Sequence, residues 1–479
     1  MIAPSARNLP PIIWAVAIFG SLSSAGFGFD QAWWASIMSS QQFARRFGSQ
    51  DPTEETWGLT ERQQSLGTGL GYAGIQSAVV SIGVIIESTC QTSYAQFLVG
   101  KVVVYFGGGI ASNVIPVYQG ECAPQSLRGL MAGSYNVFLM VGGLAAALVV
   151  YLCRHIPGDW AWRGVVVAQI AIPALNWLSL PFLPESPYWL MHRGKLDEAA
   201  ASLARLRALS LSAARTELDH LHDLALQAQQ EQQQHKSSSS SWSACLTDPI
   251  LRRRTIICVG AQIFQQAQGI SFVANYQAVF LQRIGFRQVL LMSVVVYVIG
   301  IAGNLAGVIV ADRLGRRRVL LISAALLAAC MLSIGGLTND GTPREYRTQV
   351  AAVALLMLWF FTFQATWGPL AWVLTAEIPP ASWVRETMVA LAGLAAYGTG
   401  LVIVFVNPYT QAEIEGSVAF IYGGLSVAAT GFVWFVVPEM KRRSLEEIDE
   451  MFAEKVPSRE FRGYCCKAGT LQDERIEFA

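Results

Sequence analysis

The stretch GVIVADRLGRRRVLL, residues 307–321, places Asp312 and four arginines between two long apolar runs. Charged side chains are costly inside the hydrocarbon layer of a membrane, so we expect this segment at the membrane surface, between two membrane-crossing helices. The chain of 479 residues is 53% hydrophobic and only 14% charged, which is too apolar for the core of a soluble protein. The composition therefore predicts an all-α membrane protein that crosses the bilayer several times.

Eleven stretches have the roughly 20 predominantly apolar residues that a transmembrane helix needs. The first is preceded by a single basic residue, Arg7, and is too long for a cleaved signal peptide, so we expect it to remain as a span. The predicted spans are 11–36, 66–88, 95–118, 130–152, 164–183, 255–282, 289–310, 319–338, 350–374, 388–409 and 417–437.

A polar stretch separates the fifth and sixth of these spans. Its leucine-periodic part predicts amphipathic helices, and the run QAQQEQQQHKSSSSS at 227–241 is typical of a flexible linker. Basic residues concentrate here, at Arg313–Arg318 and at Lys441–Arg443, so the positive-inside rule places all three segments in the cytoplasm. We therefore predict an N-terminal bundle, a cytoplasmic linker, a C-terminal bundle and a cytoplasmic tail, at residues 1–183, 184–254, 255–437 and 438–479.

Several classes of function are disfavoured by the same sequence. A net charge of +1 implies no general attraction to nucleic acid, and the eight cysteines form no Cys-x-x-Cys motif and have no metal-binding spacing to a histidine. The sequence contains no nucleotide-binding loop and no nucleophile motif, so an ATP-driven pump and an enzyme are both disfavoured. We expect no cofactor and no metal, and a monomer in the lipid bilayer that handles a small molecule.

The two halves of the chain share a pattern of charged residues, which indicates an internal repeat. The shared residues follow one another at nearly matching intervals in each half: Glu377, Arg385 and Glu439 in the second, and Glu121, Arg128 and Glu185 in the first. In the second half the segment DRLGRR precedes this series. Its counterpart is expected near Thr56 and is absent there.

The repeat also indicates a missing segment between two spans. Residues 63–94 lead from one apolar helix into the end of another, and these 32 residues are too few for two crossings, so a segment of about 20 residues is missing. Eleven complete crossings would put the chain ends on opposite sides of the membrane. A shortened region 66–88 that does not span would keep both in the cytoplasm, and we favour this arrangement.

Six motifs carry a resemblance to a known family: PVYQGECAPQSLRG, LPESPYWL, QQAQGISF, ADRLGRRR, WGPLAWVLTAEIP and VPEMKRRSLEEIDEMF. Together they resemble the fungal sugar porters of the major facilitator superfamily, such as hexose, alpha-glucoside and quinate permeases. The resemblance covers almost the whole chain. It implies twelve helices in two pseudo-symmetric six-helix halves and transport by alternating access, with a second arginine-rich segment that this chain lacks.

The charged residues of the repeat are expected to form a cytoplasmic gate. Arginine forks at helix ends can pair with carboxylates of neighbouring helices, and such pairs would break as the carrier opens inward. The alternative is that the arginines only obey positive-inside topology. The predicted gate residues are Glu121, Arg128, Glu185, Asp312, Arg316, Arg317, Glu377, Arg385 and Glu439, with Arg316, Arg317 and Arg385 facing Glu377 and Glu439. In the first half the arginine-rich partner is missing, and Tyr188 replaces an arginine that is usual in the family.

Two ionisable residues inside spans are candidates for proton coupling. Asp30 matches an aspartate that the resembling family associates with protons, and Lys101 stands where that family usually has arginine. A carboxylate that pairs with a cation and then separates from it can take up a proton. The alternative is an aspartate at a helix end in contact with water. Glu87 also falls inside an apolar run, and the sequence assigns it no role.

Sugar recognition needs amide and hydroxyl groups and an aromatic face. The candidates within family-like motifs or at matching positions are Gln265, Gln266, Ser271, Trp367, Trp372 and Asn136, and Asn275 is a candidate by helix phase. Tyr276 and Asn304 are further candidates by helix phase. The alternative for any one of them is packing between helices. The segment LAGLAAYGTGLVIVF carries alanine and glycine where relatives often have asparagine, so specificity for a simple hexose is in doubt.

These observations predict a secondary transporter of a sugar or related polyhydroxy compound, driven by proton symport and located in the plasma membrane. Two alternatives remain open. The first is a sugar sensor that does not transport, although a sensor is expected to have a longer tail than residues 438–479. The second is a carrier whose transport is impaired by the missing segment.

Overall fold

The structure is a computed structural model that describes most of the chain. Two-residue strands, β1 (Ser49–Gln50) and β2 (Trp57–Gly58), pair antiparallel, and the other described elements are helices. The described residues are 10–37, 43, 49–50, 57–58, 78–90, 93–123, 128–179, 182–219, 221–223, 241–283, 286, 288–338, 346–380, 384–441, 443, 445–461 and 463–464.

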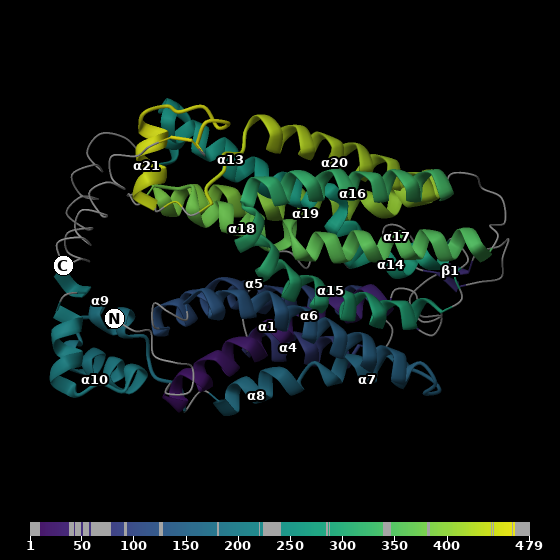
Figure 1. Ribbon diagram of the computed structural model, residues 1–479. Helices are drawn as coiled ribbons and strands as arrows, with labels where there is room; N and C mark the ends of the chain where they lie inside the picture. The colour runs from purple at the N-terminus through teal and green to yellow at the C-terminus, as the bar shows by residue number, and fades with distance from the viewer. Residues whose placement is uncertain are drawn as a thin grey trace. The chain divides into compact units, whose positions relative to one another are not determined.

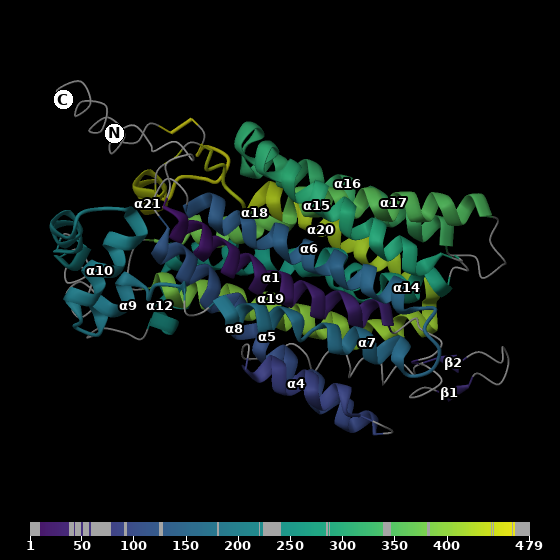
Figure 2. The ribbon, with the colours of Figure 1, turned by 90° about the horizontal axis from the view of Figure 1, so that it is seen from below.

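The chain forms two compact units, of which the first contains residues 1–228 with 277–279 and 288–298. In this unit α1 packs against α6, α5 and α8, and α4 packs against α5 (Figures 1 and 2). The helices of the first unit are α1 (Pro11–Ile37), α4 (Ala78–Ser88), α5 (Tyr94–Cys122), α6 (Arg128–Cys153), α7 (Trp160–Ala168), α8 (Ala171–Ser179), α9 (Pro187–His192) and α10 (Leu196–Arg207).

The second unit contains most of the chain after residue 228. Here α16 packs against α20 and α17, and α13 packs against α19 and α18. The helices are α12 (Ser241–Thr247), α13 (Pro249–Gln265), the π-helix η4 (Gln266–Ile270), α14 (Ser271–Arg283), α15 (Val289–Leu314), α16 (Arg316–Thr338), α17 (Tyr346–Ala365), α18 (Trp367–Glu377), α19 (Arg385–Ile414), the 3-10 helix η5 (Glu415–Ser417), α20 (Val418–Phe435) and α21 (Leu445–Ala453).

Eight of the described helical segments are long and apolar enough to cross a membrane. The predicted span 66–88 is described only from Ala78 onward, as α4. Its 11 residues rise about 16 Å, roughly half the thickness of the hydrocarbon layer. The sequence predicts the missing segment within residues 63–94, of which 63–77 and 91–92 lie outside the described part of the chain.

Two predicted spans are each divided into two helices, and a proline explains each division. Pro173 has no N–H to donate to the carbonyl of Gln169, and its ring crowds that carbonyl, so α7 ends and α8 begins two residues later. Pro369 stands in the same relation to Ala365, where α17 ends, and Thr366 has the non-helical angles φ −133° and ψ −84°. Both breaks free backbone groups for side chains of neighbouring helices.

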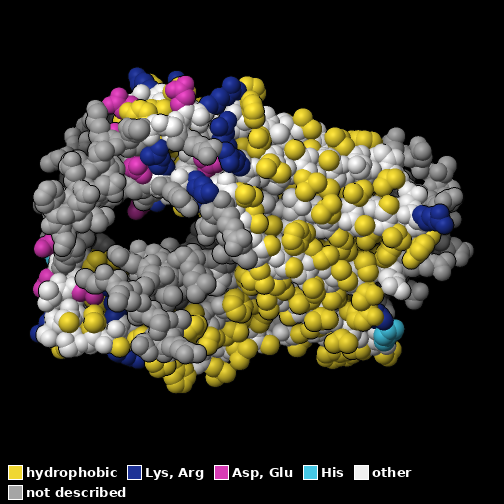
Figure 3. All heavy atoms as spheres, viewed as in Figure 1, with side chains coloured by type: hydrophobic (Ala, Val, Ile, Leu, Met, Phe, Trp, Pro, Cys, Tyr) yellow, Lys and Arg dark blue, Asp and Glu magenta, His cyan; other side chains and the backbone are white. Residues whose placement is uncertain are grey.

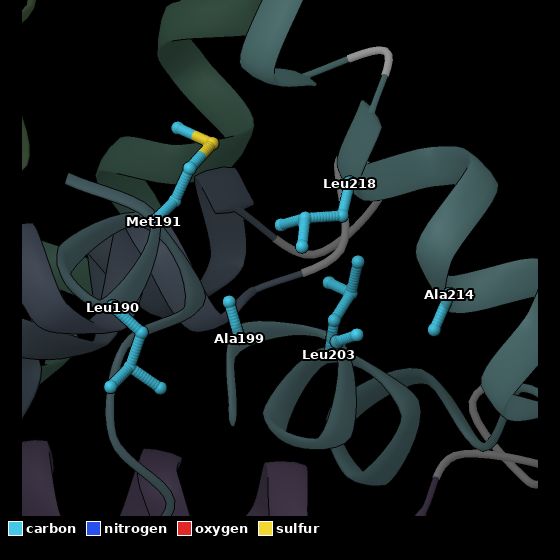
Figure 4. Packing of buried hydrophobic residues seen from close by; sticks show 7 residues of the cluster. Leu190, Met191, Ala199, Leu203, Ala214 and Leu218 are labelled. Atoms are coloured by element: carbon cyan, nitrogen blue, oxygen red, sulfur yellow. The ribbon is translucent and has the colours of Figure 1, made fainter. Parts of the chain in front are cut away.

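The polar stretch after α8 is held together by an apolar cluster of its own (Figure 4). Leu203 and Ala199 lie one turn apart on α10, and their side is buried against the other members of the cluster. An ion pair of 2.7 Å between Arg215 and Asp197 also joins residue 215 to α10. The cluster consists of Leu190, Met191, Ala199, Ala200, Leu203, Ala214 and Leu218.

Helices α4 and α5 approach so closely that side chains are excluded from the contact. A Cβ atom added at Gly83 would lie 2.6 Å from the backbone nitrogen of Val104, and one added at Gly100 would lie 2.7 Å from Cγ of Glu87. Small residues at such positions let helix backbones meet in a membrane protein. This contact brings Glu87 of α4 beside the turn of α5 that carries Lys101.

We expect Gly83→Ala to destabilise the protein, because the methyl group would meet rigid backbone of α5. The predicted cost is about 1–3 kcal/mol of unfolding free energy. The matched control is Gly424→Ala in α20, where an added Cβ meets nothing within 4 Å. Thermal unfolding of the two purified variants in detergent measures the difference, and equal midpoints would contradict the close α4–α5 contact.

Candidate functional site

The first unit contains a buried ion pair between two helices. The Nζ of Lys101 on α5 lies 2.8 Å from Oδ1 of Asp30 on α1, and the two side chains are 1% and 7% exposed. The structure therefore brings together the two residues that the sequence selects for proton coupling. A pair this deeply buried is held by its own attraction and by the groups around it, because water does not solvate it.

Aromatic and amide groups surround this pair. The indole nitrogen of Trp33 donates to Oδ1 of Asp30 at 3.0 Å, and the ammonium of Lys101 lies 4.3 Å from the centre of the Trp33 ring and 4.6 Å from that of Tyr105. With its amide nitrogen facing Asp30, Gln169 donates to Oδ1 at 3.0 Å and accepts from Trp33 at 2.9 Å. Gln169 occupies the break between α7 and α8, so the proline-induced division positions this amide.

A cavity of about 40 Å³ opens beside the pair within the first unit. Its wall combines apolar residues such as Phe27 with the polar groups of Asp30, Gln169, Ser23 and Asn176. The Oδ1 atom of Asn176 is buried and has no hydrogen-bond partner in the described part of the chain. A cavity of this size has room for water beside the Asp30 carboxylate.

The second unit lines up polar side chains along α13, η4 and α14. Gln265 donates to the carbonyl of Gly368 at 2.8 Å, Ser271 donates to Oε1 of Gln266 at 2.7 Å, and Asn275 donates to the carbonyl of Ser271 at 2.8 Å. The π-helix between them contains Gly269 with φ of 113°, a backbone conformation that glycine tolerates. Gln266 is half-buried, so its side-chain amide can make further hydrogen bonds to a bound ligand.

The two candidate tryptophans of α18 differ in their surroundings. Trp367 is 1% exposed, and its indole nitrogen donates to the carbonyl of Leu320 on α16 at 3.2 Å, so it packs within the unit. Trp372 is 38% exposed, which suits a binding role better. Asn136, on α6 of the first unit, is half-buried. Asn304 donates to the carbonyl of Gly300 in its own helix at 3.1 Å.

Charged residues of the predicted gate gather at one end of the second unit. Figure 3 shows hydrophobic side chains along its helices and Lys and Arg side chains near α21. Arg316 pairs with Glu377 at 3.1 Å, and its backbone nitrogen donates to Oε1 of Glu439 at 3.1 Å. These contacts join the start of α16 to the end of α18 and to the segment after α20.

The side chains of Arg317 and Arg385 bind backbone carbonyls, whereas the sequence predicts that they face Glu377 and Glu439. Arg317 donates to the carbonyl of Trp434 at 2.7 Å, and Arg385 donates to the carbonyl of Ala376 at 2.6 Å. The last carbonyls of a helix have no partner within it, and these guanidinium groups satisfy those of α20 and α18. Of the three arginines, only Arg316 contacts both glutamates.

The first-half gate residues are less closely grouped. Glu121 accepts a hydrogen bond from Ser186, which also caps α9, and the exposed Glu185 contributes its backbone carbonyl to Ser202. Tyr188 packs against the apolar cluster of α9 and α10. The side chains of Arg128 and Asp312 lie outside the described residues.

Sequence reasoning missed two buried polar residues near η4. Asn407 of α19 is 1% exposed and accepts from the hydroxyl of Tyr422 at 3.1 Å. The Tyr422 ring stacks on Phe272 and covers Gly269. The available signal in the sequence was the dipeptide Asn407–Pro408 inside an apolar run. Pro408 leaves the Val404 carbonyl without its helical partner, and this carbonyl accepts a hydrogen bond from the hydroxyl of Tyr276 at 2.9 Å. Tyr276 thus has a packing role.

Comparison with known proteins identifies the family. Residues 71–452 match the family model described as "Sugar (and other) transporter". The chain belongs to this family. It is 30% identical over 403 residues to the probable glucose transporter rco-3 of Neurospora crassa, a match that covers 80% of this chain and 66% of that transporter. It is 28% identical over 488 residues to the major facilitator-type transporter ecdD of Aspergillus rugulosus, covering 92% of this chain and 87% of that one.

Two further comparisons bear on fold and alternative function. A solved structure of the proton:xylose symporter XylE has a TM-score of 0.68 at 22% identity, covering 92% of this chain and 99% of that one. The High glucose sensor RGT2 of Saccharomyces cerevisiae is 31% identical over 363 residues, covering 74% of this chain and 47% of the sensor. The predicted major facilitator fold and the predicted relationship to fungal sugar porters are confirmed, and the protein is a multi-pass membrane protein of a sugar transporter family.

We expect Arg316→Gln to lower the unfolding free energy by about 1–3 kcal/mol, because it leaves the partly buried Glu377 carboxylate without its cation. The Oε2 atom of Glu377 is already buried without a hydrogen bond in the described part of the chain. Arg318→Gln is the control, since Arg318 is exposed in the same turn. Denaturation in detergent compares the two, and an equal effect of both changes would contradict the importance of the Arg316–Glu377 pair.

Proposed function

We propose that the protein carries a sugar or related polyhydroxy compound across the plasma membrane together with a proton, by alternating access. The observation that carries this proposal is the buried Asp30–Lys101 pair beside a polar cavity, in a chain of a sugar transporter family. The similarity to XylE, whose structure is titled a proton:xylose symporter, supports the proton step.

In the proposed cycle, a proton from the cavity binds the Asp30 carboxylate and removes its attraction to Lys101. The contact between α1 and α5 then loses its ionic component, and the helices of the first unit are free to rearrange. Trp33 and Gln169 hold the Asp30 carboxylate in place while it is ionised. A sugar that binds the rearranged state more tightly than the paired state links its own movement to that of the proton.

Sugar recognition in this proposal uses the polar row of the second unit. Gln266 and Ser271 offer donors and acceptors at the two ends of the π-helix, and Trp372 offers an exposed aromatic face. Gln265 donates to the Gly368 carbonyl in the first turn of α18 and so ties the row to that helix. Asn275 donates to the carbonyl of Ser271. We also propose a sugar-binding role for Asn136, which is half-buried on α6.

The proposed gate consists of Arg316, Glu377 and Glu439. Each contact is near water and therefore weak, on the order of 1 kcal/mol, so substrate binding can shift the balance between closed and open states. Arg317 and Arg385 maintain the helix ends that the gate joins. We further propose the domain limits predicted from the sequence and a monomeric carrier.

A sugar sensor is the second candidate, favoured by the similarity to RGT2. Uptake of labelled glucose, xylose, galactose, polyols and quinate into proteoliposomes, with and without an inward proton gradient, distinguishes the two. The carrier accumulates one of these compounds when the gradient is present. Binding without uptake or exchange would support a sensor or a transport-impaired carrier instead.

We expect Asp30→Asn to reduce gradient-driven accumulation by about 100-fold, because an amide cannot bind and release the proton. Exchange of sugar across the membrane, which needs no net proton movement, is expected to fall much less. Asp219→Asn on the exposed surface is the control and should accumulate substrate like the unaltered protein. Equal accumulation by both variants would refute the role of Asp30.

We expect Gln266→Ala to raise the sugar concentration for half-maximal uptake about tenfold, the effect of losing roughly 1.4 kcal/mol of hydrogen bonding. Gln282→Ala is the control, because Gln282 is exposed on α14. Initial rates of uptake over a range of sugar concentrations give the values. A half-saturation unchanged by Gln266→Ala would exclude this amide from the sugar site.

A further inference from the structure

A second carboxyl group lies beside the Asp30–Lys101 pair. Glu87 of α4 is 0% exposed, and neither of its carboxyl oxygens has a hydrogen-bond partner in the described part of the chain. The close contact of α4 and α5 at Gly83 and Gly100 places Glu87 directly beside Gly100, the residue that precedes Lys101. It interacts electrostatically with Lys101, Asp30 and the amide of Gln169.

The charges of this cluster do not balance when both carboxyls are ionised. Asp30 and Glu87 would carry two negative charges, and Lys101 supplies one positive charge. An isolated carboxylate away from water is far more costly than a neutral carboxyl group. Asp30 has the ammonium of Lys101 at 2.8 Å and the indole N–H of Trp33 as partners, whereas Glu87 has no cation within ion-pair distance in the described part of the chain. The cluster is therefore neutral when one proton is retained on Glu87.

We propose that Glu87 is a second proton-carrying residue, which exchanges a proton with Asp30 around the shared cation Lys101. In the structure Glu87 is the acid and Asp30 is the carboxylate. In the exchange the O–H bond of Glu87 breaks, an O–H bond forms on Asp30, and Glu87 becomes the counter-ion of Lys101. The number of protons and the net charge of the cluster stay the same. This inference rests on the proposed proton-coupled transport, since it supplies the partner that Lys101 needs once Asp30 is protonated.

The neighbouring elements offer few other ionisable groups to take this role. On α5 the titratable residues around Glu87 are Lys101, Tyr94 and Tyr105, and α1 contributes Asp30. On α7 the charged residue is Arg163, whose guanidinium donates to the carbonyl of Cys90 at 2.8 Å beyond the end of α4. Helix α8, which also contacts α4, carries no charged side chain.

Infrared spectroscopy of the purified full-length protein tests the proton on Glu87 without requiring transport. The unaltered protein and Glu198→Gln, a change at an exposed residue of α10, should show the carbonyl stretch of a protonated buried carboxyl at neutral pH. That band should be absent in Glu87→Gln. It should also be lost in Asp30→Asn, because Glu87 then ionises to pair with Lys101. A band that persists in Glu87→Gln would overturn the proposal.

Transport provides the second test. In proteoliposomes, Glu87→Gln should lower the ratio of gradient-driven accumulation to sugar exchange by about tenfold, and Glu87→Asp, which keeps an acid, should restore most of it. An unchanged ratio in a folded Glu87→Gln variant would overturn the role of Glu87 in coupling. If the unaltered protein neither accumulates nor exchanges any sugar, the proposed function fails, while the infrared band still decides whether Glu87 holds a proton.

Discussion

The contact between Lys101 and Asp30 is the interaction on which the arrangement of the first unit depends. At 2.8 Å and almost fully buried, the pair carries a large desolvation cost, which the N–H groups of Trp33 and Gln169 reduce by donating to Oδ1 of Asp30. Loss of the Asp30 charge would end the ionic contact between α1 and α5 and leave Lys101 to Glu87 of α4, so binding of a single proton has a large effect on the stability of the paired state. A chain that only needed stability would be served as well by apolar side chains at these positions.

Helix breaks place the groups around this pair and in the second unit. Pro173 ends α7 at Ala168, just before Gln169, whose amide faces Asp30, and Pro369 ends α17 at Ala365. Gln265 donates to the Gly368 carbonyl in the first turn of the helix that follows. The π-helix of residues 266–270 shifts the following polar residues relative to α13. In a bilayer such irregular backbone persists only where protein groups or water satisfy it, and Gln265 and Tyr276 make such bonds near these breaks.

Long apolar runs were enough to predict most helices, because residues that span hydrocarbon have little choice of conformation. The pairing of Asp30 with Lys101 was predictable for the same reason, since a lone charge in a span needs a partner. The choice between competing hydrogen-bond partners was not predictable. Arg317 and Arg385 donate to carbonyls at the ends of helices and not to the predicted glutamates. Trp367 is buried against α16. The sequence shows Glu87 inside an apolar run but assigns it no role, because its significance depends on the α4–α5 contact, which the linear sequence does not reveal.

The central claim is that protonation of the Asp30–Lys101 cluster is linked to sugar binding. The number of protons taken up per sugar bound measures this directly, by calorimetric titration of the purified protein in buffers of different protonation enthalpy. We expect a net proton uptake per sugar bound that varies with pH in the unaltered protein and disappears in Asp30→Asn. Sugar binding with the same proton uptake in both proteins, or with none at any pH in either, would contradict it.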